Sequence, residues 1–105
     1  MTQPEQWILV EVKSDEPHYR IFTSWAGGYL TGDSWRLNSG MLRVNDLGDY
    51  YDFIGYSGSV YRCHKDSYCV SKMHNAAVLN RLVENSNRTL VVISEEDVLD
   101  VLLKF

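Results

Sequence analysis

Two cysteines and two histidines, Cys63, His64, Cys69 and His74, are the residues best suited to bind a metal ion. Structural zinc sites pair cysteines at short spacings such as C-x₂-C, whereas five residues separate Cys63 from Cys69. Neighbouring side chains on a strand point to opposite faces, so Cys63 should face the core beside Tyr61 and His64 should face solvent. We therefore expect no bound metal and no cofactor. The sequence leaves open whether Cys63 and Cys69 form a disulfide.

The segment Gly55-Tyr56-Ser57-Gly58-Ser59 is similar to a nucleophile elbow but lacks its final glycine. A true elbow lies between a buried parallel strand and a helix, whereas Ser57 falls in a turn between two alternating strands. A small enzyme that uses His64 with Asp66 or Ser57 is an alternative, but no motif supports it. We expect a protein that is not an enzyme.

The elements that hold these residues can be inferred from periodicity. Aromatic and β-branched residues alternate with polar ones from Tyr19 to Lys65, which predicts short antiparallel strands joined by tight turns. Strands are expected at residues 7–13, 19–25, 34–44, 50–56, 59–65 and 89–93. Within 34–44 the apolar positions change from odd to even, which predicts a bent strand with a β-bulge at Gly40.

Helical spacing of apolar residues begins after residue 70. It predicts a helix over 72–85, with Ser71 as its N-cap, and a second helix opened by Ser94 with acids in its first turn. The 105 residues are expected to form a single domain over 1–105, an α+β fold in which a twisted antiparallel β-meander of four to six strands is packed by two C-terminal helices. The expected core comprises Trp35, Leu37, Phe53, Tyr61, Leu79, Leu82, Val91, Val98 and Leu102.

Charge and hydropathy exclude several partners. The formal net charge is −4, so the basic footprint needed for the nucleic-acid backbone is absent. The N-terminus has no basic and apolar leader, and no apolar run approaches the roughly 18 residues that span a bilayer. We expect a cytoplasmic protein with no direct contact to nucleic acid or membrane.

The surface of the predicted meander favours protein binding. The strand at 50–56 carries Tyr51 and Phe53 on one side and Tyr50, Ile54 and Tyr56 on the other. If helices cover one side, the other exposes tyrosines near arginines, and these two residue types are enriched at protein–protein hot spots. The predicted binding residues are Tyr50, Tyr56, Arg43 and Arg62. Cross-strand tyrosine pairs that only stabilise the sheet are the simpler interpretation.

A longer pattern adds a resemblance. The stretches WAGGYLTGDSWRLNSG (25–40) and DYYDFIGYSGSVYRCHK (49–65) resemble small uncharacterised proteins encoded by bacteriophages and prophages. The resemblance covers residues 25–69 and brings no activity and no functional residue. It implies an accessory protein, a class that often binds and inhibits a host protein and that includes anti-CRISPR proteins.

These observations together predict a non-catalytic protein-binding module with a protein partner. A homodimer is compatible with the same surface. An acidic DNA mimic is a further alternative, although the acids are spread through the chain rather than gathered in rows.

Overall fold

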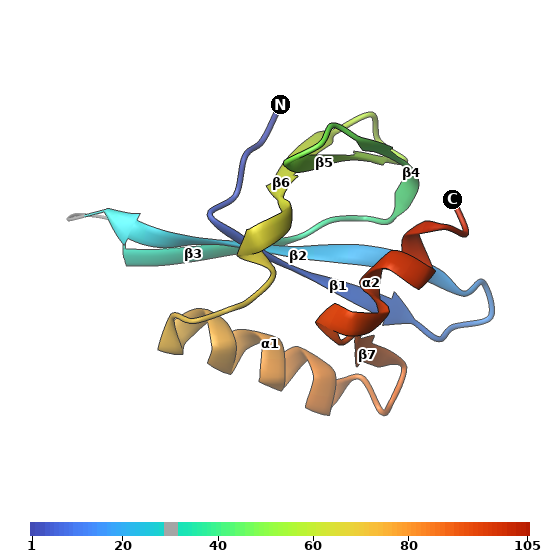
Figure 1. Ribbon diagram of the computed structural model, residues 1–105. Coiled ribbons are helices and arrows are strands. Elements are labelled where there is room, and N and C mark those ends of the chain that lie inside the picture. Colours follow the sequence, from blue (N-terminus) through green and yellow to red (C-terminus); the bar gives the residue numbers. More distant parts are fainter. Residues whose placement is uncertain (29–31) are drawn as a thin grey trace.

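The computed structural model describes residues 1–28 and 32–105, which form two antiparallel sheets, two α-helices and one 3₁₀ turn (Figure 1). The large sheet has the order β3-β2-β1-β7, with β1 at Gln6–Val12, β2 at His18–Gly28, β3 at Gly32–Leu37 and β7 at Leu90–Val92. The small sheet has the order β4-β5-β6, with β4 at Met41–Asp46, β5 at Tyr50–Gly55 and β6 at Val60–His64. The 3₁₀ turn η1 is Lys65–Ser67, and the helices are α1 at Met73–Asn85 and α2 at Glu95–Leu102.

The arrangement confirms the α+β fold and the antiparallel pairing of β4 with β5 and of β5 with β6. It also divides between two sheets the strands that the sequence suggested as one meander. Residues 29–31, which belong to the phage-like pattern, lie outside the described residues. No helix in the described part of the chain is long and apolar enough to cross a membrane.

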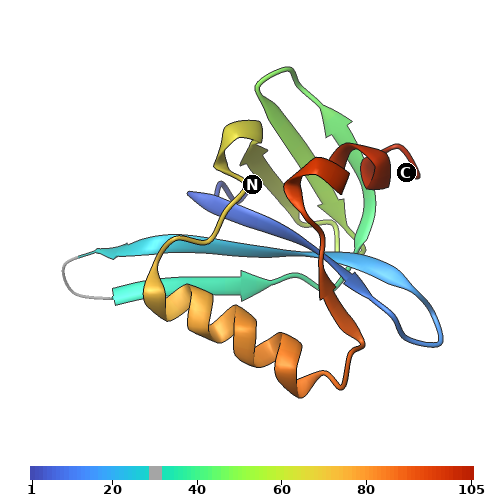
Figure 2. The ribbon, with the colours of Figure 1, turned by 60° about the horizontal axis from the view of Figure 1, so that its bottom comes forward.

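Both faces of the large sheet are covered. Helix α1 lies along one face, and the small sheet and α2 lie over the other (Figure 2). In β1, Trp7 and Leu9 pack toward the small sheet, whereas Ile8 and Val10 pack toward α1. Successive residues of a strand point to opposite faces, so β1 is apolar at consecutive positions because neither face meets water.

The core therefore has two parts. The cluster between the sheets and α2 contains Trp7, Leu9, Ile21, Met41, Phe53, Tyr61, Cys63, Val98, Val101 and Leu102. The cluster under α1 contains Ile8, Val10, Phe22, Leu79 and Leu90. Five predicted core residues are confirmed as buried: Phe53, Tyr61, Leu79, Val98 and Leu102. Leu37, Leu82 and Val91 are half-buried at the margins.

The prediction for Trp35 is wrong, because this side chain is 40% exposed. It stacks on Phe22 with the ring centroids 5.6 Å apart. Strand β3 is an edge strand of the large sheet, so Trp35 has a neighbouring strand on one side only. The Trp35 ring therefore covers Phe22 at the edge of the core.

The predicted single bent strand at 34–44 is also wrong. β3 ends at Leu37 in the large sheet, and β4 begins at Met41 in the small sheet. The change of apolar phase therefore marks a crossing between sheets and not a bulge at Gly40. The side chain of buried Asn38 fixes the crossing, since its Oδ1 accepts a hydrogen bond of 2.8 Å from the backbone N–H of Ile21. Gly40 has φ +136°, a conformation that favours glycine.

Helix α1 confirms the helix predicted over 72–85, but its N-cap is Lys72 and not Ser71. Ser71 instead joins the helix approach to β1, because its Oγ accepts from Gln6 Nε2 at 2.8 Å and its backbone N–H donates to Gln6 Oε1 at 2.9 Å. At α2 Ser94 occupies the predicted N-cap position, but its hydroxyl donates to Asp97 Oδ2 at 2.9 Å and makes no capping hydrogen bond to the helix backbone.

Candidate protein-binding surface

Three of the four predicted binding residues lie on the outer face of the small sheet. The cross-strand registers are Arg43 with Ile54, Asp52 with Arg62, and Tyr50 with His64. Residues directly opposite one another share a face, so Arg43, Tyr50 and Arg62 lie together on the side away from buried Phe53.

Two of these three residues already have partners within the sheet. Arg62 Nε and one of its terminal amino groups each donate a hydrogen bond of 2.9 Å to the Asp52 carboxylate. These hydrogen bonds lower the pKa of Asp52. The Tyr50 ring meets the His64 ring edge-on at 4.9 Å. Arg43 is exposed and has no ion pair among the described residues, whereas Arg62 on the same face is paired with Asp52.

Tyr56 lies at the opposite end of β5 from Tyr50, two residues beyond Ile54, the register partner of Arg43. It follows the far end of β5, roughly 20 Å from Tyr50 at about 3.3 Å per residue. Its ring is 62% exposed and covers Gly40. It lines a polar hollow of about 260 Å³ together with Glu16, Pro17, His18, Arg20 and Ser39. The two predicted tyrosines are therefore separated along β5, and Arg43 lies between them.

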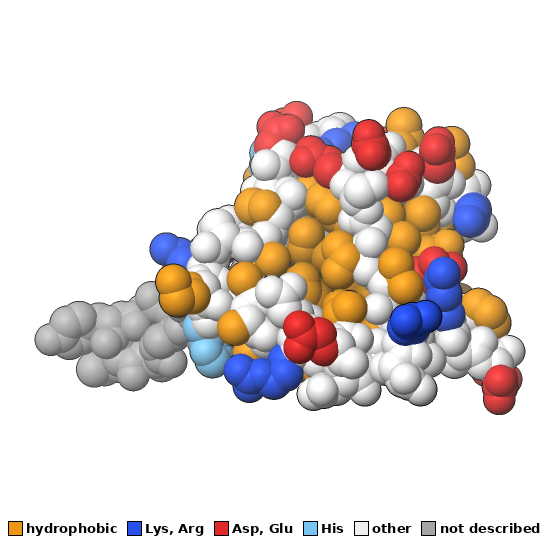
Figure 3. Space-filling model, turned by 90° about the horizontal axis from the view of Figure 1, so that it is seen from below, with side chains coloured by type: hydrophobic (Ala, Val, Ile, Leu, Met, Phe, Trp, Pro, Cys, Tyr) orange, Lys and Arg blue, Asp and Glu red, His pale blue; other side chains and the backbone are white. Residues whose placement is uncertain are grey.

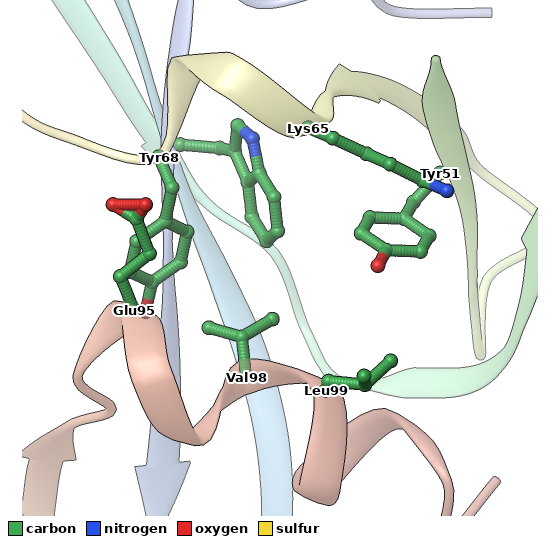
Figure 4. A pocket seen from close by; sticks show the side chains of 7 residues that line it. Tyr51, Lys65, Tyr68, Glu95, Val98 and Leu99 are labelled. Carbon is green, nitrogen blue, oxygen red and sulfur yellow. The ribbon is translucent and has the colours of Figure 1, made fainter. Parts of the chain in front are cut away.

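A pocket that the sequence did not predict lies between α2 and the small sheet (Figure 4). Its volume is about 120 Å³, and its lining residues are Trp7, Tyr51, Lys65, Tyr68, Glu95, Val98 and Leu99. Lys65 extends toward Tyr51 on one side, Glu95 and Tyr68 lie on the other, and α2 contributes Val98 and Leu99 (Figure 4). We call it the aromatic pocket.

Hydrogen bonds hold two rings of the aromatic pocket in place. Trp7 Nε1–H donates to the His64 carbonyl at 2.7 Å, and the Trp7 ring meets the Tyr68 ring edge-on at 4.7 Å. The Tyr68 hydroxyl accepts from the Leu9 backbone N–H at 3.0 Å and donates to the Ile93 carbonyl. Burial raises the pKa of Tyr68 to about 12. Hydrogen bonds within the chain therefore hold the pocket wall in place.

The mouth of the aromatic pocket is charged. Lys65 Nζ lies 2.7 Å from Asp46 Oδ1 and 4.7 Å from the centroid of the Tyr51 ring, and the hydrogen bond to Asp46 raises the pKa of Lys65. Glu95 opens α2, whose first turn is entirely acidic. Leu99 is 59% exposed beside this mouth. Seen from below, hydrophobic side chains occupy the centre of the molecule and acidic side chains gather along one border (Figure 3).

Sequence reasoning missed this pocket because its rings come from distant segments. The expectation that Tyr51 shares a side with Phe53 is correct, since the two rings lie 5.7 Å apart. No periodic pattern linked Trp7 and Tyr68 to Tyr51. Their residue types were a weak indication, because buried tyrosine and tryptophan normally need a hydrogen-bond partner and therefore occur where two segments meet.

Of the residues of the alternative enzyme, His64 and Asp66 lie close together, with His64 Nδ1 4.0 Å from Asp66 Oδ2, whereas Ser57 lies apart from both. Ser57 and His64 lie at opposite ends of the β5–β6 hairpin. The Ser57 hydroxyl is 3.1 Å from that of Ser59. His64 Nδ1 accepts a hydrogen bond of 3.0 Å from the Asp66 backbone N–H, an arrangement that starts η1.

The candidate metal ligands are also separate. Cys63 is buried, Cys69 is exposed, and both are free thiols. Within residues 1–28 and 32–105, no three His, Cys, Asp or Glu side chains converge in a way that could hold a metal ion.

No family model, no curated protein and no solved structure matches this chain.

Proposed function

We propose that this protein is a non-catalytic protein-binding module that receives one apolar side chain of its partner in the aromatic pocket. The observation that carries the proposal is a pocket with hydrogen-bonded Trp7 and Tyr68 rings next to the exposed Leu99. A volume of about 120 Å³ suits a single side chain rather than a substrate. Binding energy at interfaces concentrates in such central apolar pockets, and a preformed wall reduces the entropy lost on binding.

The charge around the pocket indicates the chemistry of the partner. Helix α2 carries Glu95, Glu96, Asp97 and Asp100, whereas Lys65 at the mouth is already paired with Asp46. The chain as a whole has a net charge of −4. A complementary partner therefore presents an apolar side chain flanked by lysine or arginine, and its association weakens as salt screens these charges. The resemblance to phage-encoded proteins makes a host protein, inhibited by the binding, the first class of partner to test.

The outer face of the small sheet is the second candidate surface. Arg43 is exposed there without an ion pair among the described residues, and Tyr50 lies on the same face, four residues along β5 from the register partner of Arg43. Arginine and tyrosine are both enriched at hot spots. The two surfaces can be separated by mutation, because Leu99 borders the aromatic pocket from α2 whereas Tyr50 lies on the outer face of β5.

The test compares the wild type with three variants, first in capture from a host lysate and then in titrations with the purified partner. Leu99→Asp should weaken binding at least about tenfold, because a charge would border the apolar pocket. Tyr50→Ala should retain binding. Met73→Asp is the matched control for adding a charge at an exposed apolar position, since Met73 is 88% exposed on α1.

The opposite pattern would reject the aromatic pocket. If Leu99→Asp binds like the wild type and Tyr50→Ala does not, the small-sheet face is the binding surface. Thermal melts should be similar for Leu99→Asp and Met73→Asp, since both side chains are exposed. A partner whose affinity is independent of salt would contradict the proposed basic chemistry.

A further inference from the structure

The polar hollow that Tyr56 lines lies where β3 stops covering the edge of β2. After β3 ends, the backbone N–H of Asn38 donates to the Ile21 carbonyl at 3.1 Å. Residues 18–20 of β2 pair only with β1 in the described part of the chain. The hollow is bounded by the start of β2, by Ser39 of the crossing and by Tyr56. Its volume of about 260 Å³ exceeds the share of a single water molecule, which is roughly 30 Å³ in the liquid.

A hydrogen-bonded pair of side chains fixes a cation at this hollow. His18 and Arg20 are two residues apart on β2, so their side chains share one face. Arg20 Nε–H donates to His18 Nε2 at 3.0 Å. A guanidinium has no acceptor, so Nε2 accepts and Nδ1 carries the imidazole proton, which it donates to the Glu16 carbonyl at 2.9 Å. The Glu16 backbone therefore orients the guanidinium through the His18 ring.

The charge of Arg20 has no counterion in the described part of the chain. The side chain is half-buried and forms no ion pair among the described residues. Its terminal amino groups make no hydrogen bond there either, since only Nε is bonded. Arginines that leave water are normally paired with an anion. The parallel N–H groups of a guanidinium match two oxygens of an anionic ligand, so this cation selects an oxyanion.

Two hydroxyl groups supply further donors. Ser39 and Tyr56 line the same hollow, and neither hydroxyl has a hydrogen bond among the described residues. A carboxylate has two oxygens, and the guanidinium alone can bind both. A phosphate group has three acceptor oxygens, which leaves one for a hydroxyl donor. We propose that the polar hollow binds a phosphate group, with Arg20 as the charged donor and Ser39 and Tyr56 as the hydroxyl donors.

Glu16 gives this proposal a test of sign. It is the acidic residue of the lining, and its carboxylate repels an anion in the hollow. The structural role of Glu16 belongs to its backbone carbonyl, which accepts from Ser14 Oγ at 2.9 Å and from His18 Nδ1 at 2.9 Å. The side chain is exposed and can be neutralised without loss of these bonds. Glu16→Gln should therefore tighten phosphate binding, whereas it would weaken a cation site.

The test is an NMR titration of the full chain that follows the Arg20 Nε–H and the backbone amides at constant ionic strength. Inorganic phosphate should shift the resonances of Arg20 and Ser39 saturably, with a dissociation constant below about 10 mM. Phenyl phosphate distinguishes the sources of the group. Tighter binding than that of inorganic phosphate indicates a phosphate monoester, and equal binding indicates free phosphate. Acetate should bind at least about threefold more weakly than phosphate, because it offers no third oxygen.

Variants assign the donors. Arg20→Gln should weaken phosphate binding at least about tenfold, because it removes the charge and the parallel N–H groups. Arg81→Gln is the matched control, since Arg81 is exposed on α1 without an ion pair among the described residues, and it should bind like the wild type. Ser39→Ala and Tyr56→Phe should each weaken binding about threefold to tenfold. Tyr56→Phe keeps the ring that covers Gly40.

The absence of a saturable shift up to about 50 mM phosphate would overturn the proposal. So would a folded Arg20→Gln variant that binds like the wild type, weaker binding by Glu16→Gln, or acetate that binds as tightly as phosphate. If Arg20→Gln does not fold, the exposed Ser39 and Tyr56 decide, and unchanged affinity in both of their variants would overturn the proposal. Leu99→Asp should bind phosphate like the wild type, so failure of the proposed function leaves this test intact.

Discussion

The ring of Tyr56 lies so close to Gly40 that a Cβ on Gly40 would stand 2.8 Å from both Cδ2 and Cε2 of that ring. The same glycine has φ +136° and is the last residue of the crossing before β4. Two separate constraints, one steric and one conformational, therefore act at a single position between the two sheets.

We predict that Gly40→Ala lowers the free energy of unfolding by about 1–3 kcal/mol, since an L side chain is strained at this φ. Urea denaturation measures the loss. In a Tyr56→Ala background the loss should be smaller, because the steric part is removed and the conformational part remains. An equal loss in both backgrounds would show that the exposed Tyr56 ring moves aside without cost.

Tyr68→Phe should cost about 1–3 kcal/mol of stability while leaving the ring of the aromatic pocket in place. The change leaves the Leu9 N–H and the Ile93 carbonyl without their hydroxyl partner. The control is Tyr50→Phe, because the Tyr50 hydroxyl has no hydrogen bond among the described residues, and its effect should lie within about 0.5 kcal/mol. Equal denaturation midpoints for the two variants would contradict the assigned role of Tyr68.

The Asp52–Arg62 pair predicts a pH dependence of stability. Hydrogen bonds from Arg62 lower the pKa of Asp52 in the folded protein, so the unfolded chain binds the proton more readily. The stabilisation is present above the unfolded pKa of about 3.9 and is lost as pH falls through the lower folded value. Wild type should therefore lose more stability than Asp52→Asn between about pH 5 and pH 2. This range extends roughly one to two pH units on either side of the unfolded pKa.

Asp46 contributes in the same direction, because the hydrogen bond from Lys65 lowers its pKa as well. The variant with both Asp46→Asn and Asp52→Asn should show the flattest acid profile in denaturation experiments. Exposed Asp15→Asn, in the turn after β1, is the control and should follow the wild type. A wild-type profile parallel to that of Asp52→Asn would contradict the prediction.

The two thiols should react differently with a water-soluble disulfide reagent. Cys63 is fully buried, and burial raises its pKa, whereas Cys69 is exposed. The thiolate is the reactive form, so one thiol per chain should react rapidly in the native protein. Both thiols should react in the denatured protein. Absence of any free thiol in denaturant without reductant would reveal a disulfide and overturn the assignment of free cysteines.

Periodicity along the chain was enough to predict the α+β class, the β5–β6 hairpin and helix α1. These features depend on residues close in sequence, because alternation and helical spacing describe how neighbouring side chains are directed. The burial of Phe53, Tyr61 and Leu79 followed from the same patterns. Of the predicted binding surface, the grouping of Arg43, Tyr50 and Arg62 on one face follows from the strand registers.

Tertiary structure alone decided how the strands are shared between two sheets. The change of apolar phase around Gly40 is the same for a bulge within a strand and for a crossing between sheets. Only the pairing of β3 with β2 and of β4 with β5 distinguishes them. The exposure of Trp35 on an edge strand depends on that pairing as well.

The aromatic pocket has the same origin. Trp7, Tyr51 and Tyr68 come from β1, β5 and the segment after η1, and no local pattern links them. Tyr68 meets Trp7 because its hydroxyl is held between the backbones of Leu9 and Ile93. The sequence determined which elements form, because that information is local. The site depended on which distant elements meet, because only packing brings their side chains together.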